Sequence, residues 1–414
     1  MINFPTSFLA FFIFGLWTCS AVHAKPLKVY VLCGQSNMEG HAKISTFEAM
    51  GTDPLTKPIL KEMVDKKGNP VVCDQVWISY FTGGRDNMGE GFGKLTAGFG
   101  SRRNPAEASD KIGPEFTFGI YAQKALREPV LIIKTAWGGK SIHTAFRPPS
   151  AGPYPFSEKE LENLKKRGRN LKEVKADKAE QTGRFYRLMI EHVRRVLKDV
   201  ERVYPGYNPE EGYELAGFAW FQGWNDMVAG GTYPNRGKAD GYDAYSECLA
   251  HFIRDVRKDL KAPDMKFVIG VMGVGGPLDK YASPRYVPIH GSFREAMATP
   301  ASRPEFKGNV AAVRTAPFWD ARLQRMEDNQ GKIKQMAGFL KSKHKDHPNK
   351  DGSMDAKAQK AYLDKYRRTL ISGEDESYAK IARSNAAYHY FGSAKTMARI
   401  GKAFAEAMIE MRKK

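Results

Sequence analysis

The sequence predicts an α/β protein in which a mainly parallel, doubly wound sheet lies between two layers of helices. Six short apolar runs are typical of buried parallel strands, because strands covered on both faces do not alternate polar and apolar residues. These runs are Val29–Leu32, Val71–Phe81, Val130–Ala136, Leu215–Phe221, Phe267–Val274 and Val310–Thr315. Helical patterns separate or follow them, and this alternation indicates a three-layer α/β/α sandwich.

Three helices are indicated by apolar residues that recur at helical spacing. The first is formed by Phe185, Leu188, Met189, Val193, Val196, Leu197 and Val200, and the second by Tyr245, Leu249, Phe252, Ile253, Val256 and Leu260. The last carries Met397, Ile400, Phe404, Met408 and Ile409 on one face. Each pattern supplies one apolar stripe that can cover the sheet.

Two charged regions interrupt this order. Residues 146–182 begin with a proline-rich stretch and continue as a charged helical segment, and residues 321–380 are charged and poor in strands. Neither region has enough apolar residues for a core of its own. We therefore expect one domain, residues 25–414, with insertions at about 146–182 and 321–380 on the rim of the sheet.

The first 24 residues resemble a secretory signal peptide. The apolar run from Leu9 to Trp17 is too short to span a bilayer, and Val22 and Ala24 place small residues at the −3 and −1 positions of a cleavage site. The segment before the run has no Lys or Arg, so an uncleaved anchor is the alternative. We expect a secreted or periplasmic protein with no stable membrane insertion after cleavage.

The formal net charge of +19, from 65 basic and 46 acidic residues, favours anionic partners. No zinc-finger spacing, RNA-binding motif or basic helix with interleaved aromatic residues accompanies the charge, so nucleic acid is not expected as a partner. Solvated surface charge is the simplest interpretation, and an anionic polysaccharide is the partner that remains open.

Cysteine and histidine spacing predicts neither a disulfide framework nor a metal site. Export leaves Cys33, Cys73 and Cys248, which form at most one pair, and whether Cys33 and Cys73 pair stays open. We expect no metal and no organic cofactor.

The segment VYVLCGQSNMEG at residues 29–40 contains the best candidate nucleophile. An apolar strand breaks at Gly34, and Ser36 follows two residues later. A serine on a sharp turn at the carboxyl end of a strand can act as a nucleophile if a base lies within hydrogen-bond reach. His389, just before the last helix, is the favoured base, and His143, after a glycine-rich turn, is the alternative.

Oxyanion donors are expected from turns that follow two other strands. Gly138 and Gly139 lie in IKTAWGGKSI at 133–142, and Gln222 and Asn225 lie in WFQGWND at 220–226. Each turn alone is ordinary, because glycine and polar residues often follow strands. Three such turns after three strands of one sheet together predict an active site.

Four sequence blocks carry a resemblance to a known family. GQSNM at 34–38, GPEFTFG at 113–119, WGGKSI at 137–142 and FQGWND at 221–226 resemble the SGNH-type esterases. More narrowly, they are similar to the sialate O-acetylesterase-like domains of carbohydrate esterase family 6. The blocks occur in the family's order and, with the histidine before the last helix, span residues 29 to about 400.

The resemblance implies an SGNH/flavodoxin-like sandwich and a serine esterase that acts on acetylated carbohydrate. It implies that Ser36 attacks the acetyl ester and that His389 is the base. It also implies oxyanion donors from the Ser36 amide, from the turn at Gly138 and Gly139, and from Gln222 or Asn225. Gln35, inside the GQSNM block, joins the expected substrate-binding residues.

The sequence departs from the superfamily at the acid that orients the base. This Asp usually lies three residues before the histidine, where this chain has Ala386, with Asn385 beside it. The acid can come from another strand end, with Asp226 favoured over Asp320. Alternatively, Asn385 or a backbone carbonyl orients His389, or the domain acts mainly in binding.

Further aromatic and acidic residues near these motifs have expected roles. Glu115 in GPEF is expected to bond a backbone turn rather than to serve as the acid. Trp137, Trp224 and Trp319 follow strands, where each can stack on a sugar or fill the core.

Three functional hypotheses follow from the sequence. The leading one is an exported serine esterase that removes O-acetyl groups from carbohydrate. The second is a binding protein for anionic polysaccharide with little or no catalysis. The third is hydrolysis of lipid or short acyl esters, which a preference for longer acyl chains would identify.

Overall fold

The computed structural model describes residues 1, 25–84, 86–281 and 284–413 and contains a seven-stranded sheet in the order β4-β3-β6-β1-β7-β8-β9. The expected signal peptide, apart from Met1, lies outside the described residues. The strands are β1 (Leu27–Gly34), β3 (Val76–Thr82), β4 (Gly89–Lys94), β6 (Val130–Ala136), β7 (Tyr213–Phe221), β8 (Lys266–Val271) and β9 (Val310–Arg314). A small second sheet pairs β2 (Ala42–Lys43) with β5 (Lys111–Ile112).

All neighbouring strands of the large sheet are parallel except β3 and β4. The six predicted parallel strands are confirmed, although β3 begins at Val76 and not at Val71. The antiparallel edge strand β4 was not predicted. Its sequence GEGFGK contains three glycines and two charged residues, which are depleted in strands, so it carries no strand signal.

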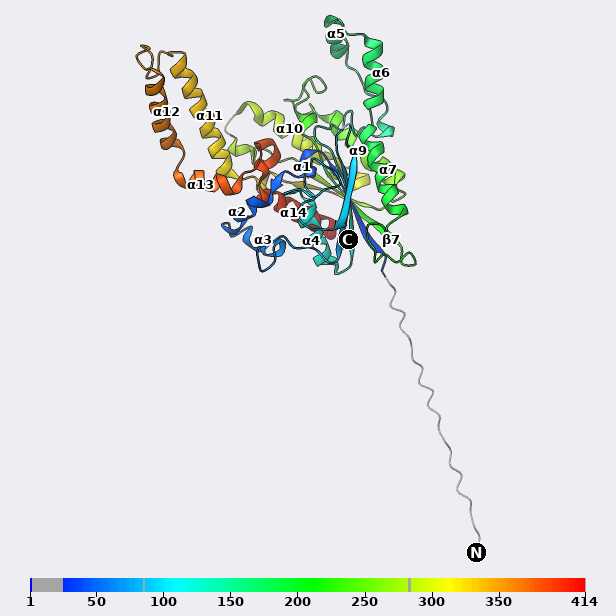
Figure 1. The fold of residues 1–414 in the computed structure, drawn as a ribbon. Helices are drawn as coiled ribbons and strands as arrows, with labels where there is room; N and C mark the ends of the chain where they lie inside the picture. Colours follow the sequence, from blue (N-terminus) through cyan, green and yellow to red (C-terminus); the bar gives the residue numbers. More distant parts are fainter. Residues whose placement is uncertain (2–24, 85, 282–283, 414) are drawn as a thin grey trace.

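Helices cover both faces of the sheet (Figure 1). On one face, α4 (Glu115–Leu126) packs on β3 and β6, and α14 (Ala394–Lys413) packs on β8, β9 and α4. On the other, α7 (Arg184–Lys198) packs on β6, while α10 (Val287–Ala298) packs on β8 and on α9 (Asp243–Asp259). The three predicted helices are confirmed as α7, α9 and α14.

The sheet core is apolar on both faces, as expected for parallel strands. Every residue of β1 and of β6 is buried. Phe252 of α9 packs against Trp220 on one face, and Phe404 of α14 packs edge-on against Phe221 on the other. This packing holds the carboxyl ends of β6, β1 and β7 side by side, where the candidate site lies.

The remaining helices are short or lie outside the two layers. They are α1 (Ser36–Glu39), α2 (Phe47–Gly51), α3 (Lys57–Met63), α5 (Glu158–Lys166), α6 (Leu171–Gln181), α8 (Trp224–Met227), α11 (Ala321–Lys341), α12 (Ala356–Leu370) and α13 (Gly373–Ala382). Eight 3₁₀ helices complete the described part of the chain: η1 (Ile44–Thr46), η2 (Pro149–Ala151), η3 (Leu278–Lys280), η4 (Pro284–Tyr286), η5 (Thr299–Ser302), η6 (Pro304–Phe306), η7 (Ala316–Phe318) and η8 (Ala387–Gly392).

Two helical arms project from the end of the molecule where α1 lies (Figure 1). We call residues 158–181 the α5–α6 arm and residues 321–370 the α11–α12 arm. Helices α5, α6 and α12 contain no fully buried residue, so little apolar packing holds them. Side-chain caps from Ser157, Asn170, Asp320 and Asp355 satisfy N–H groups at the starts of the four helices.

Two further findings concern membrane-spanning helices and disulfide bonds. No helix among the described residues has the length and apolar character needed to cross a bilayer. Cys33, Cys73 and Cys248 are all free thiols, so the pair left open between Cys33 and Cys73 is not formed in this structure.

Candidate active site

Ser36 is the first residue of α1 and lies directly beyond the end of β1. The turn requires glycine at position 34, because a Cβ there would lie 2.2 Å from the Phe221 carbonyl oxygen of the neighbouring strand β7. The Ser36 side chain is 9% exposed, and its hydroxyl has no hydrogen-bond partner among the described residues. Its backbone N–H, in the first turn of a helix, likewise has no partner within the helix.

His389 lies in η8, where the chain turns before α14. Tyr390 and Phe391 follow it with φ of 52° and 58°, a left-handed conformation that non-glycine residues rarely adopt. Two hydrogen bonds hold Tyr390 in place: its hydroxyl accepts from the Gly273 N–H at 2.8 Å and bonds Thr315 Oγ1 at 2.7 Å. The buried neighbours therefore fix the position of the turn.

The structure brings the Ser36 and His389 segments together. Asn37 Nδ2, one residue after Ser36, donates to the Tyr388 carbonyl oxygen, one residue before His389, at 3.2 Å. His41, two residues after the end of α1, stacks face to face on His389, with ring centroids 3.9 Å apart and planes within 4°. The two expected catalytic residues thus share one rim of the sheet.

Asn385 is the hydrogen-bond partner of the His389 ring. Its Oδ1 accepts from the Ala386 N–H at 2.8 Å and lies 3.0 Å from His389 Nδ1. The backbone N–H fixes which end of the amide is oxygen, and an amide oxygen only accepts. His389 Nδ1 must therefore carry the proton, which leaves Nε2 with the lone pair that a general base needs.

The surroundings of His389 keep its ring neutral. Burial, with a smaller contribution from the charges of His41 and Lys111, lowers the pKa of His389 to about 3. No carboxylate contacts the ring in the described residues. The nearest carboxyl group in this stack belongs to Glu39, whose Oε2 lies 3.6 Å from His41 Nε2.

Asp226, the residue favoured from the sequence as the orienting acid, does not contact His389. Its carboxylate accepts from the backbone N–H groups of Ile142 and His143 at 2.9 and 3.1 Å. It also accepts from Gln222 Nε2 at 2.6 Å and from the Tyr233 hydroxyl at 3.0 Å. Burial raises the pKa of Asp226 to about 6, although the four hydrogen bonds each act to lower it. Through these bonds the carboxylate joins the loop after β6 to the turn after β7.

The other sequence candidates also have structural partners. Asp320 caps α11 and accepts from the Tyr378 hydroxyl at 2.5 Å. Glu115 accepts from the Gly113 N–H at 2.8 Å, the turn bond expected for it. The ring of His143, the alternative base, packs edge-on against Tyr154 and Tyr233 and is 5% exposed. Burial lowers its pKa to about 4.

The glycine turn after β6 lies beside Ser36. A Cβ built on Gly138 would lie 3.8 Å from Ser36 Cβ, and Gly139 adopts a φ of 72° with open space around it. The N–H groups of Gly138 and Gly139 have no hydrogen-bond partner in the part of the chain that the structure describes. They are therefore free to donate to a ligand next to Ser36.

Gln35 orients Asn225. Gln35 Oε1 accepts from the Gly223 N–H at 3.0 Å, so the opposite end of its amide, Nε2, donates to Asn225 Oδ1 at 3.1 Å. The Asn225 Nδ2 group is thereby left to donate elsewhere. Gln222 Nε2, in contrast, already bonds Gln35 Oε1, Lys140 O and Asp226. Of the two donors kept from the sequence, the geometry favours Asn225.

A buried ion pair supports the underside of α1. Lys134 and Glu115 are both fully buried and 2.7 Å apart. Lys134 Nζ also donates to the carbonyl oxygens of Glu39 and Phe99, at 2.8 and 2.7 Å. Burial lowers the pKa of Lys134 to about 8. Because Glu39 ends α1, this lysine ties the nucleophile's helix to β6.

A cavity of about 420 Å³ opens next to the glycine turn. Its walls include Gly83 and Gly84 after β3, Lys140 after β6, and Arg184 and Phe185 at the start of α7. The C-terminal part of α6 in the α5–α6 arm forms another wall. The cavity falls within the volumes common for small-ligand sites, roughly 300–1,000 Å³.

Only one of the three expected tryptophans remains available to a ligand. Trp137 and Trp319 are buried, and they fill the core. Trp224 is half-buried and lies 5.9 Å, between ring centroids, from Tyr388, which is 46% exposed. These two rings form an aromatic surface beside His389.

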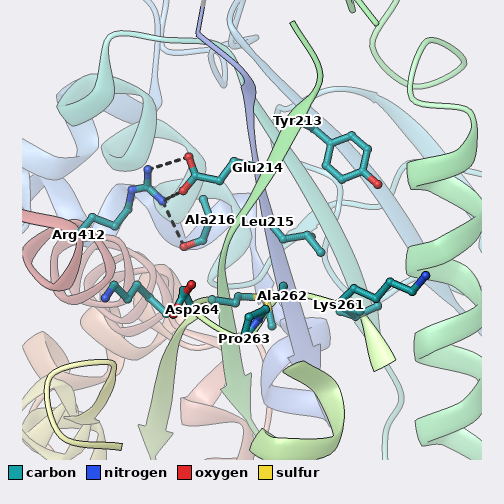
Figure 2. A pocket seen from close by; sticks show the side chains of 12 residues that line it. Tyr213, Glu214, Leu215, Ala216, Lys261, Ala262, Pro263, Asp264 and Arg412 are labelled. Atoms are coloured by element: carbon teal, nitrogen blue, oxygen red, sulfur yellow. Dashed lines mark hydrogen bonds and ion pairs between the residues drawn. The ribbon is translucent and has the colours of Figure 1, made fainter. Parts of the chain in front are cut away.

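A second cavity, of about 580 Å³, lies at the opposite end of the strands, where β7 and β8 begin (Figure 2). The beginnings of β7 and β8 line it, together with Arg412 near the end of α14, which pairs with Glu214. The beginnings and ends of parallel strands are a sheet's length apart, so this cavity is remote from Ser36.

Sequence reasoning gave no role to Glu39 or Lys134 and did not predict that His41 stacks on His389. His41 and Glu39 directly follow the GQSNM block, and their position next to Ser36 was the available signal. Lys134 stands in an otherwise apolar strand, and a lysine in a buried strand indicates a buried partner. Within the described residues, no group of His, Cys, Asp and Glu side chains is arranged to hold a metal ion.

Comparison with known proteins gives a family for the middle of the chain. Residues 96–288, just under half of the chain, match the family model described as carbohydrate esterase, sialic acid-specific acetylesterase. This segment is similar to that family. The match includes the GPEF, WGGKSI and FQGWND blocks, while Ser36 and His389 lie outside it. The match to this carbohydrate esterase family supports an esterase.

Solved structures include similar chains at low identity. A carbohydrate acetylesterase from Xanthomonas citri is 14% identical, with a TM-score of 0.38 and 69% of this chain covered. This chain spans about half, 49%, of that protein's length. A protein from Arabidopsis thaliana is 15% identical, with a TM-score of 0.34, and the match covers 70% of this chain and 86% of that one. No curated protein matches this chain.

Proposed function

We propose that this protein is an exported serine esterase that removes O-acetyl groups from carbohydrate, with Ser36 as nucleophile and His389 as base. The observation that carries the proposal is the meeting of the α1 and η8 segments, with His389 Nε2 left unprotonated because Asn385 holds the proton at Nδ1. The carbohydrate esterase match at residues 96–288 supports the substrate class.

The first half of the reaction forms an acetyl-enzyme. Ser36 Oγ attacks the acetyl carbonyl carbon, and His389 Nε2 takes the hydroxyl proton. The negative oxygen of the tetrahedral intermediate accepts hydrogen bonds from the N–H groups of Ser36, Gly138 and Gly139 and from Asn225 Nδ2. The intermediate collapses when the bond to the sugar oxygen breaks and His389 protonates that oxygen.

The second half releases acetate. Water attacks the acetyl carbonyl and gives its proton to His389, and the same donors hold the oxyanion. Collapse breaks the bond to Ser36 Oγ, which regains its proton from His389. Trp224 and Tyr388 form one wall for the sugar, and the cavity next to Lys140 receives the neighbouring part of the substrate.

The experiment that tests the function is acetate release from a panel of acetylated glycans, with p-nitrophenyl acetate as a substrate without sugar. We expect acetate release from at least one glycan and a fall in rate with butyrate and longer acyl esters. Uniform hydrolysis of long acyl esters would favour the lipid or acyl esterase. No hydrolysis of any ester would exclude the esterase.

We expect Asn385→Asp to move the acidic limb of the pH profile of kcat/KM upward. A carboxylate at Nδ1 favours the charged imidazolium, so the pKa of His389 rises from about 3, by about 1–3 units for a close opposite charge. The base must be neutral, so activity is then lost at a higher pH than in the wild type. Above the limb the rate rises by about tenfold or more, because the carboxylate stabilises the imidazolium of the transition state.

The control for this variant is Asn385→Ala, which removes the partner without adding charge. We expect it to lower kcat, since the ring is then free to rotate, and to leave the acidic limb near its original pH. An Asn385→Asp profile with the wild-type limb would contradict the assignment of His389 as the base.

Asn225→Ala is expected to lower kcat by roughly 10²–10³-fold with little change in KM, the cost typical of one lost oxyanion donor. The reason is that Asn225 Nδ2 would donate to the oxygen only once it becomes negative. Steady-state kinetics on p-nitrophenyl acetate measure this split. A rise in KM with unchanged kcat would instead assign Asn225 to substrate binding.

The second candidate function is binding of anionic polysaccharide with weak catalysis. It is favoured by one specific observation: the partner of His389 is the neutral Asn385 and not a carboxylate. Loss of the acid in a triad enzyme costs on the order of 10⁴ in rate. Salt-sensitive binding of an anionic glycan by the wild type, without release of acetate, would establish this alternative.

A further inference from the structure

The tip of the α5–α6 arm carries a dense group of cations. Between residues 165 and 175 the only acidic residue is Glu173, whose carboxylate already accepts from Asn170 Nδ2 at 2.9 Å. The cations of this tip are all exposed: Lys165, Lys166, Arg167, Arg169, Lys172 and Lys175. The arm's outer end is therefore strongly positive.

The tip of the α11–α12 arm repeats this pattern. Residues 341–350, which end α11 and lead toward α12, contain Lys341, Lys343, Lys345 and Lys350, and all four are exposed. Asp346 is the only acidic residue in this segment. The two tips belong to separate parts of the sequence and have the same charge character.

These cations differ from those at the base of the α11–α12 arm. There, Arg322 pairs with Asp375 at 2.6 Å, and Arg383 pairs with Glu327 at 2.6 Å. Among the described residues, none of the tip cations of either arm forms an ion pair. Crowded like charges without partners repel one another, and a bound polyanion would offset that repulsion.

The position of the tips relates them to the candidate site. Both arms project from the end of the molecule that carries α1, and Figure 1 shows them on either side of it. An extended polymer that contacts both tips therefore passes over the end of the molecule that carries α1.

We propose that the two arm tips together bind a polyanionic polysaccharide and hold its chain across the candidate active site. The proposal names the substrate class of the function proposed above and rests on it for the role of the bound chain, although binding itself does not require catalysis. Carboxylated and sulfated glycans share the required chemistry, which is a repeating negative charge along a flexible chain.

The composition of the tips favours polysaccharide over the other polyanions. Neither tip contains a Phe, Trp or Tyr on which a nucleic-acid base could stack. Phe339, next to the second tip, is stacked on His347 at 4.1 Å between ring centroids. Neither tip presents the apolar face that an interfacial membrane helix inserts between lipids.

The test uses the full mature chain and two triple charge reversals. One variant carries Lys165→Glu, Arg167→Glu and Arg169→Glu, and the other Lys341→Glu, Lys343→Glu and Lys345→Glu. Binding to polygalacturonate and to heparin is measured in the Ser36→Ala background, so that no turnover intervenes. We expect each variant to weaken binding on the order of tenfold at low salt and to reduce the salt dependence.

Kinetics on two substrates separate this proposal from the proposed function. In the otherwise wild-type chain, each variant should raise KM for acetylated polygalacturonate and leave kcat/KM for p-nitrophenyl acetate unchanged. Absence of hydrolysis of every ester tested, the acetylated glycans included, in the wild type would refute the esterase and leave the binding measurement intact.

A matched control carries the same charge change elsewhere: Lys57→Glu, Lys66→Glu and Lys67→Glu, on α3 and the turn after it, where all three side chains are exposed. It should bind polygalacturonate and heparin as the wild type does. Equal loss in the control and tip variants would overturn the proposal, as would no binding of either glycan. Tighter binding of single-stranded DNA or of anionic lipid vesicles than of both glycans would overturn it as well.

Discussion

Ser36→Ala lowers kcat for hydrolysis of p-nitrophenyl acetate by about 10⁴–10⁶-fold, the cost typical of losing the nucleophile of a serine hydrolase. The variant has no oxygen with which to form the acetyl-enzyme, while the oxyanion donors and the base remain. Acetate release and p-nitrophenol absorbance both measure the loss.

The same variant should fold as the wild type does. The Ser36 hydroxyl has no partner in the described residues, so its removal leaves no buried group unsatisfied. A thermal melt within a few degrees of the wild type verifies this. Ser141→Ala is a matched control in the neighbouring turn, where Ser141 Oγ accepts from the Thr144 N–H at 3.2 Å, and it should retain activity within about tenfold. Full activity of Ser36→Ala would mean that another residue is the nucleophile.

Lys134→Met lowers the free energy of unfolding by about 3–5 kcal/mol, because removal of one partner of a buried pair leaves an uncompensated charge. The stranded group is the Glu115 carboxylate, and the carbonyl oxygens of Glu39 and Phe99 lose their donor as well. Urea denaturation measures the change. Since Lys134 also holds the end of α1, esterase activity should fall in the variant that remains folded.

The double variant Lys134→Met with Glu115→Gln is the control. Glutamine removes the stranded charge and keeps an oxygen that can accept from the Gly113 N–H, so part of the stability should return. A single variant that loses less than about 1 kcal/mol would show that the pair lies in a more solvated place than the structure gives it.

Much of the fold follows from local sequence patterns. The runs Val29–Leu32 in β1 and Val130–Ile133 in β6 are apolar throughout, and buried parallel strands have this character whatever their neighbours are. Strand β4 could not be predicted in this way, because its glycines and charged residues give no strand signal. Only its pairing with β3 makes it a strand. Its existence is a property of the tertiary structure.

The candidate site was predictable to the level of segments, and less so to the level of atoms. Turns after β1, β6 and β7 were expected to converge, and they do, since parallel strands place their carboxyl ends at one edge. Which polar atoms remain free depends on side-chain hydrogen bonds. The Gln222 Nε2 group already donates to three acceptors. Gln35 Nε2 donates to Asn225 Oδ1, which leaves the Asn225 Nδ2 group available to a ligand.

The hydrogen-bond partner of His389 was likewise not predictable from sequence alone. Asp226 and Asn385 were both open candidates, because sequence distance does not give the distance between side chains. Asp226 is held by four donors around the loop after β6, and Asn385 reaches His389 within its own turn. The stacking of His41 on His389 had no sequence signal beyond its closeness to Ser36.

Ser36 as the nucleophile is tested most directly by labelling the wild-type protein with a fluorophosphonate, which reacts with activated serines, and locating the adduct by peptide mass spectrometry. We expect a single adduct, on Ser36. We also expect slow labelling in His389→Ala and nearly normal labelling in His143→Ala. An adduct on another serine, or equal labelling of Ser36 with and without His389, would contradict this assignment.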